Sequence, residues 1–234
     1  MTYGTKVLGT VSELNSTPIK GKRIGIVSTG SSNLSAVMRS LSKAGFSPDL
    51  IPQGGGGLEE QYDCVILPGV GNFGFVMGEL ERSGTKSWLK EAHSAGTPIL
   101  GICLGAQLLF DSSEEAPGVE GLGIIRGSVR KLDPVDMARV PHMGWNEVLI
   151  SDLGKKELMA LSGKSFYFAH SYYLEPSDPS NVIAVSHHSE EFCSIAGNLN
   201  CLAIQFHPEK SGRAGQEILR RGVEWLCRVD SQNV

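Results

Sequence analysis

Short apolar runs alternate with amphipathic stretches in the first half of the chain. Residues 23–28 are apolar between polar turn residues, which predicts a strand. Residues 33–44 follow with apolar side chains every three or four positions and stop at Gly45, which predicts a helix. The first ordered elements are therefore expected to be a strand and a helix.

The same order of elements recurs further along. Residues 62–67 predict a second strand with a helix after it, and residues 85–95 predict a further helix that Gly96 ends. Another apolar run and a helix-like run then flank Cys103. Strands that alternate with helices pair in parallel and are covered on both faces, so this half predicts a parallel sheet between helices.

Beyond about Gly123 the pattern changes to short strands with few helices between them. The candidates are residues 127–132, 147–150, 166–169, 181–186 and 202–206, and a helix is predicted at 212–228. Strands without intervening helices pair in antiparallel or mixed fashion. We therefore predict an α/β fold with an open mixed sheet, largely parallel and flanked by helices.

The length of the chain indicates its number of domains, and its charge indicates which kinds of partner it can bind. The 234 residues suit one large α/β domain over 22–234, and residues 1–21, rich in Thr, Ser, Gly and Lys, predict a loosely ordered extension. The formal net charge of −4 is spread along the chain, which gives no case for binding nucleic acid or an anionic membrane surface. No apolar stretch approaches the length that a membrane span requires.

The cysteine count indicates a reducing compartment. Five cysteines without a Cys-x-x-Cys pair or zinc spacing predict a cytoplasmic chain with no structural metal and no cofactor. Four of them are expected to be small buried hydrophobes. These four are Cys64, Cys193, Cys201 and Cys227.

Cys103 has a different setting, because Gly101 and Gly105 lie two positions away on either side. This is the layout of a nucleophile elbow, with sulfur in place of a serine oxygen. Glycine is needed on both sides because Cβ atoms there would collide with the neighbouring strand and helix. Unpaired N–H groups and the positive end of the helix dipole favour the thiolate. Cys103 is therefore predicted to be a nucleophile.

A catalytic thiol needs a histidine that moves its proton, and that histidine needs an acceptor that fixes its tautomer. His207 is the best placed of the six histidines, because residues 203–206 predict a buried strand that ends there. The carboxyl ends of strands carry the chemistry of α/β proteins. Glu209 follows within reach of the ring, so a Cys-His-Glu triad is predicted, with an ordinary strand-ending turn as the alternative.

Residues 69–74 contain a formal Gly-x-Gly-x-x-Gly directly after a strand. A dinucleotide-binding turn is disfavoured, because that fingerprint belongs to the first strand–helix unit and needs an acidic residue at a second strand end. Gly69 and Gly71 are instead interpreted as allowing backbone N–H groups to approach a reacting carbonyl oxygen. A plain glycine-rich turn is the alternative interpretation.

Together these motifs resemble those of the class I, triad-type glutamine amidotransferases over residues 23–228. The shared motifs are Pro-Gly-x-Gly, Gly-x-Cys-x-Gly and His-Pro-Glu, in the family's order. Within the family, the segments at 67–71, 140–146, 166–173 and 205–212 are similar to those of glutaminase subunits of imidazole glycerol phosphate synthases. The run Pro-His-Met-Gly-Trp-Asn is the most specific of them.

The resemblance implies hydrolysis of L-glutamine through a Cys103 thioester, with His207 and Glu209 handling protons. It implies an oxyanion site at Gly69, Val70, Gly71 and the amide of Leu104. It also implies glutamine-binding roles for Gln107, Glu115, His170, Ser171 and Tyr172. For Glu115, an exposed loop acid is the alternative interpretation.

The resemblance further implies a heterodimer with a (β/α)8 synthase subunit that receives the ammonia. The residues that match interface positions are Trp145, Tyr167 and Lys210. The alternative interpretation is core packing for the two aromatic residues and a solvated side chain for the lysine. Residues 28–33 depart from the family's usual loop after the first strand. Three rivals therefore stay open: a paralogue that serves another synthase, a silent regulatory domain, and a free-standing hydrolase of γ-glutamyl compounds.

Overall fold

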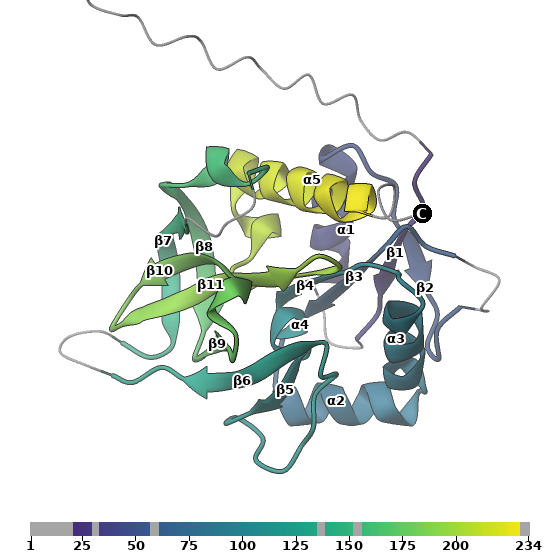
Figure 1. Cartoon of the computed structure of the whole chain (residues 1–234), viewed down its shortest axis with the longest axis horizontal. Helices are drawn as coiled ribbons and strands as arrows, with labels where there is room; N and C mark the ends of the chain where they lie inside the picture. Colours follow the sequence, from purple (N-terminus) through teal and green to yellow (C-terminus); the bar gives the residue numbers. More distant parts are fainter. Residues whose placement is uncertain (1–20, 30–32, 57–60, 135–138, 152–155, 230–234) are drawn as a thin grey trace, which may run out of the picture.

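The computed structural model describes residues 21–29, 33–56, 61–134, 139–151 and 156–229 (Figure 1). The predicted N-terminal extension lies outside this part of the chain, except for Gly21. Five parallel strands form one half of a large sheet, in the order β2-β1-β3-β4-β12. They are β1 (Ile24–Val27), β2 (Asp49–Ile51), β3 (Cys64–Gly69), β4 (Ile99–Cys103) and β12 (Cys201–Ile204).

The other half of the sheet is mainly antiparallel and continues from β12 in the order β11-β10-β7-β8. A side branch joins β9 to β11, β6 to β9 and β5 to β6. These strands are β5 (Phe110–Ser113), β6 (Ile125–Lys131), β7 (His142–Ile150), β8 (Lys164–His170), β9 (Tyr172–Pro176), β10 (Val182–His187) and β11 (Glu191–Asn198).

Helices cover both faces of the parallel half (Figure 1). The helices α1 (Leu34–Lys43) and α5 (Gly212–Val229) lie on one face, and α2 (Phe73–Arg82) and α3 (Thr85–Ser94) lie on the other. A one-turn helix, α4 (Leu104–Gln107), follows β4, and single 3-10 turns lie at Met159–Leu161, Pro179–Asn181 and Pro208–Lys210. No helix of the described residues has the length and apolar character to cross a membrane.

The sheet separates two apolar cores because successive side chains of a strand point to opposite faces. In β3, Ile66 packs in the core under α1 and α5, whereas Val65 and Leu67 pack in the core with α2 and α3. Every residue of β1, β3, β4 and β12 is buried. This two-sided burial explains why the strands are continuous apolar runs in the sequence.

The α/β class, the mixed sheet and the flanking helices are confirmed, with two corrections to the elements. Four strands, β2, β5, β9 and β11, were not predicted. β2 has three residues and two of them are exposed, and β11 buries Ser194 and Gly197 among its apolar residues, so neither shows a clear pattern. The helix after Cys103 has only four residues, so its dipole supports a thiolate less than a long helix would.

Candidate active site

Cys103 ends β4 and directly precedes α4, as the elbow motif predicted. Its φ of 53° makes it the one residue other than glycine with positive φ in the described part of the chain. This conformation is strained for an L-residue and occurs where surrounding structure holds it. A Cβ at Gly105 would overlap the carbonyl oxygen of Leu67, and one at Gly101 would lie 2.7 Å from Ala106 Cα. The flanking glycines therefore allow the tight turn that lifts the sulfur out of the sheet.

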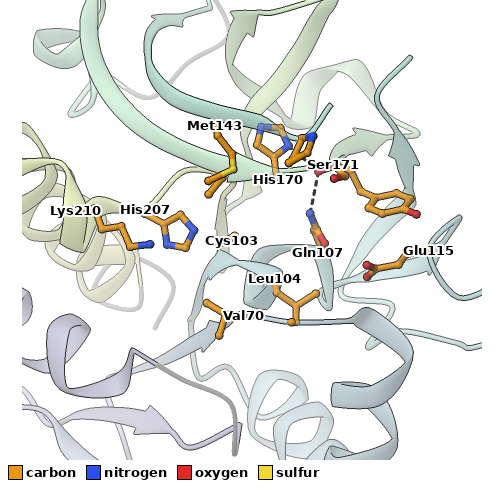
Figure 2. A pocket seen from close by; sticks show the side chains of 14 residues that line it. Val70, Cys103, Leu104, Gln107, Glu115, Met143, His170, Ser171, His207 and Lys210 are labelled. Carbon is orange, nitrogen blue, oxygen red and sulfur yellow. Dashed lines mark hydrogen bonds between the residues drawn. The ribbon is translucent and has the colours of Figure 1, made fainter. Parts of the chain in front are cut away.

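The imidazole of His207 lies beside the sulfur, on the far side from Gln107 (Figure 2). His207 follows β12, and its Nδ1 lies 2.8 Å from Glu209 Oε1. A carboxylate only accepts, so Nδ1 carries a proton and Nε2 faces the sulfur. His207 and Glu209 are both almost fully buried.

The electrostatics of this site favour a protonated imidazole. Burial by itself lowers the pKa of His207, but negative charge on the Cys103 sulfur, a hydrogen bond to it and the Glu209 carboxylate together raise that pKa to about 10. At neutral pH the His207 ring is therefore protonated. An imidazolium beside the sulfur is the partner that a thiol nucleophile needs.

The predicted oxyanion segment runs alongside the elbow. Gly69, the last residue of β3, pairs in register with Cys103, and Val70 and Gly71 follow it. Gly71 has φ 104°, in the region that favours glycine. A Cβ at Gly69 would lie 2.8 Å from the Gly105 nitrogen, so only glycine lets the two segments approach this closely.

A cavity of about 340 Å³ opens over Cys103 (Figure 2). Of the predicted catalytic, oxyanion and substrate residues, ten line it: Val70, Gly71, Cys103, Leu104, Gln107, Glu115, His170, Ser171, Tyr172 and His207. Gly69 and Glu209 line a small adjoining cavity behind them. The fold thus brings together residues that are more than 130 positions apart in the chain.

Gln107 and Glu115 are each held by a hydrogen bond with a backbone group, and Gln107 has a side-chain partner as well. Gln107 Nε2 donates to the Tyr172 carbonyl oxygen at 2.9 Å and to Gln205 Oε1 at 3.2 Å. Glu115 Oε2 accepts from the Phe73 N–H at 2.7 Å. Glu115 is half-buried and lines the cavity, so it is not the exposed loop acid of the alternative interpretation.

The three predicted interface residues lie together beside the cavity. Trp145 pairs in register with Tyr167, their ring centroids are 6.1 Å apart, and Lys210 Nζ lies 5.4 Å from the Tyr167 ring centroid. Trp145 is 60% exposed, which excludes the core-packing alternative for this residue. Lys210 lines the cavity and is also exposed, so the solvated-lysine alternative stays open for this residue.

Sequence reasoning missed three residues that line the cavity: Pro141, Met143 and Ala169. Met143 is 65% exposed and belongs to the Pro-His-Met-Gly-Trp-Asn run. Alternation from the exposed Trp145 along the same strand was the signal that could have placed Met143 on the same face. Within the described ranges, no group of three or more His, Cys, Asp and Glu side chains is arranged to hold a metal ion.

Comparison with known proteins agrees with this geometry. Residues 26–225 match the family model of the class I glutamine amidotransferases. The chain belongs to this family. Among class I amidotransferases, it is similar to "Imidazole glycerol phosphate synthase subunit HisH" of Pyrococcus furiosus, with 44% identity over 200 residues, 85% of this chain and 96% of that one. The subunit of the same name from Methanothermobacter thermautotrophicus is 41% identical over 201 residues, 86% of this chain and 98% of that one.

Two solved structures share the fold. "Crystal structure of glutamine amidotransferase" matches with a TM-score of 0.67 at 16% identity, over 87% of this chain and 98% of that one. "Structure of PurLQS from Thermotoga maritima" matches with a TM-score of 0.64 at 18% identity, over 88% of this chain and 99% of that one. The curled mixed sheet with flanking helices is therefore the fold of this class I amidotransferase.

Proposed function

We propose that this chain is the glutaminase subunit of an imidazole glycerol phosphate synthase in histidine biosynthesis. It hydrolyses L-glutamine to glutamate and ammonia, and a synthase subunit uses the ammonia to make imidazole glycerol phosphate and AICAR. The observation that carries the proposal is the Cys103–His207–Glu209 arrangement under a cavity of substrate size. The identity to HisH subunits over most of the chain supports the choice of synthase.

In the first step, the Cys103 sulfur attacks the side-chain amide carbon of glutamine. Backbone N–H groups from Gly69 to Gly71 and of Leu104 hold the oxygen as it becomes negative. The imidazolium of His207 gives its Nε2 proton to the amide nitrogen, the carbon–nitrogen bond breaks, and ammonia leaves. A thioester between Cys103 and the glutamyl group is the product of this step.

In the second step, the neutral ring of His207 takes a proton from water, and the resulting hydroxide adds to the thioester carbon. The carbon–sulfur bond breaks, glutamate leaves, and the thiolate–imidazolium pair is restored. Glu209 keeps Nδ1 protonated throughout, so that Nε2 is the atom that exchanges protons. Burial of the pair keeps its orientation fixed between the two steps.

Glutamine is held by the residues on the side of the cavity away from His207. The Glu115 carboxylate suits the α-ammonium group of the substrate, because a charge-assisted hydrogen bond is stronger than a neutral one. Gln107, His170, Ser171 and Tyr172 form the remainder of the glutamine pocket.

The partner is proposed to be a (β/α)8 synthase subunit that binds the face with Trp145, Tyr167 and Lys210, forming a heterodimer. Exposed Met143 extends this apolar surface at the mouth of the cavity. Large exposed side chains next to a pocket are typical of a binding surface. No disulfide bond joins cysteines of the described residues. A cytoplasmic location is proposed together with this function, since a reducing compartment keeps thiols reduced.

The test is ammonia release from glutamine by the purified chain, alone and with the histidine-pathway synthase subunit of the same genome and its nucleotide ligand. Strong stimulation that the Cys103→Ala variant lacks supports both the chemistry and the pathway. Labelling of Cys103 by a diazoketone analogue of glutamine without stimulation points instead to a paralogue that serves another synthase. Fast turnover without a partner points to a free-standing hydrolase, and absence of labelling and turnover to a silent domain.

A further inference from the structure

Two buried histidines next to the glutamine pocket form a chain of hydrogen bonds. His142 on β7 pairs in register with His170 on β8, so both side chains lie on the same face. His142 Nδ1 lies 3.0 Å from His170 Nε2, and His170 Nδ1 lies 2.8 Å from the Tyr172 carbonyl oxygen. At the other end, Asn146 Nδ2 lies 3.2 Å from His142 Nε2. The chain thus connects the Asn146 amide to the wall of the pocket.

The direction of every bond can be worked out from either end. At the pocket end, the Tyr172 carbonyl only accepts, so His170 carries its proton on Nδ1. The pKa of His170 is lowered to about 3, chiefly by burial, so the ring is neutral and its Nε2 is an acceptor. His142 must then donate from Nδ1.

The other end of the hydrogen-bond chain, at Asn146, also requires His142 to donate from Nδ1. Asn146 Oδ1 accepts from the Glu147 N–H at 2.8 Å, and its Nδ2 donates to the His187 carbonyl at 2.8 Å. These two backbone groups fix the orientation of the amide, so its Nδ2 also donates to His142 Nε2. The pKa of His142 is lowered to about 4 by burial and by nearby His188, which keeps this ring neutral as well. Both ends therefore require His142 to be neutral with its proton on Nδ1.

The carbonyl at the end of the chain is shared with a pocket residue. The Tyr172 oxygen accepts from His170 Nδ1 and from Gln107 Nε2, so it joins two residues that line the cavity. His170 is 6% exposed, so a lost partner at its Nε2 leaves a buried acceptor unsatisfied.

We propose that His142 is a positioning residue for glutamine binding: its Nδ1–H holds His170, and through the Tyr172 carbonyl the Gln107 side chain, in the arrangement that receives the substrate. This proposal rests on the function proposed above. His142 does not line the cavity and acts only through His170. Its role as a hydrogen-bond donor is separate from its packing, in which the ring stacks on Phe168 at 4.8 Å and on His188 at 4.1 Å between centroids.

Two substitutions separate these roles. His142→Phe keeps a ring for the stacks but has no N–H, whereas His142→Asn loses the ring but places an amide N–H where Nδ1 was. We expect the KM for glutamine to rise about tenfold in His142→Phe and about twofold or less in His142→Asn. We expect kcat to change little in both, because the nucleophile and its base are untouched. A larger rise of KM in His142→Asn than in His142→Phe overturns the proposal, because it shows a packing role.

The wild-type chain provides a measurement that does not depend on folding of a variant or on turnover. In ¹⁵N-histidine NMR spectra of the full chain at neutral pH, His142 and His170 are both expected to be neutral with the proton on Nδ1. A proton on Nε2 of His170 overturns the proposal. If the wild-type chain releases no ammonia and takes no diazoketone label, the proposed function fails, while the tautomers still decide the hydrogen-bond chain.

Discussion

The carboxylate of Glu115 accepts a hydrogen bond from the backbone N–H of Phe73 at 2.7 Å, 42 positions away in the chain. Phe73 is the first residue of α2 and lies two positions after Gly71 of the oxyanion segment. One oxygen of the proposed ammonium-binding carboxylate therefore fixes the end of the proposed oxyanion segment. In the proposed function, binding of the substrate's amino group and alignment of the oxyanion site share this one side chain.

Replacement of Glu115 by Gln and by Ala separates these two contributions. Glu115→Gln keeps an oxygen for the Phe73 N–H but loses the charge, so the KM for glutamine is expected to rise about 10- to 100-fold with a small change in kcat. Glu115→Ala removes both contacts, so kcat is expected to fall as well. Steady-state kinetics of ammonia release provides both values, and an unchanged KM in Glu115→Gln contradicts the proposed role.

The pH dependence of activity is predicted from His207. The Glu209 carboxylate contributes to the raised pKa of the His207 ring, so removal of its negative charge lowers that pKa. In Glu209→Gln, the His207 ring therefore loses its proton at a lower pH than in the wild type. Above that pH no imidazolium is present to protonate the leaving nitrogen. The descending limb of the kcat profile is therefore expected to move down by about one pH unit or more. Glu91→Gln, on the exposed side of α3, is the control, and coinciding profiles for all three proteins exclude this role for Glu209.

The two glycines of the oxyanion segment permit a peptide flip, and we hypothesise that its N–H groups are misdirected until a partner binds. Gly71→Ala places a side chain at φ 104°, which strains the backbone by about 1–3 kcal/mol. The kcat of the complex is expected to fall about 10- to 1,000-fold, with a smaller effect on KM. A free wild-type chain that turns over glutamine as fast as the complex would refute the flip.

Gly96 provides a matched control for that substitution. Its φ is 100°, a Cβ there would meet no atom within 4 Å, and it lies just beyond α3, away from the cavity. Gly96→Ala should therefore lose a similar amount of stability in thermal unfolding and keep its kcat. Equal losses of kcat in both variants would attribute the effect of Gly71→Ala to general destabilisation.

The face beside the cavity is predicted to contain a binding hot spot at Trp145. Trp145→Ala should weaken the affinity for the synthase subunit by about 2 kcal/mol or more, roughly 30-fold in Kd, because large aromatic side chains dominate interface energies. Leu199, 62% exposed in the turn between β11 and β12, is the control of similar exposure. Calorimetric titration measures both variants, and equal affinities would place the partner elsewhere.

Local chemistry in the sequence determined the main parts of this protein. Continuous apolar runs predicted β1, β3, β4 and β12, because strands buried on both faces tolerate few polar side chains. The glycines around Cys103 identified the elbow, because a tight turn excludes Cβ atoms at fixed positions. The sequence also indicated His207 and Glu209, since a strand that ends at His-Pro-Glu places both residues at the carboxyl end of the sheet.

Only the tertiary structure decided how distant residues act together. Short or partly polar strands such as β2 and β11 form because neighbouring strands supply their hydrogen bonds, which no local pattern records. The hydrogen bond from the Phe73 N–H to Glu115 and the one between His142 and His170 join residues that are distant in the sequence and meet only when the chain is folded. The direction of the histidine chain, in particular, follows from the backbone groups at its two ends, and these meet only in the folded chain.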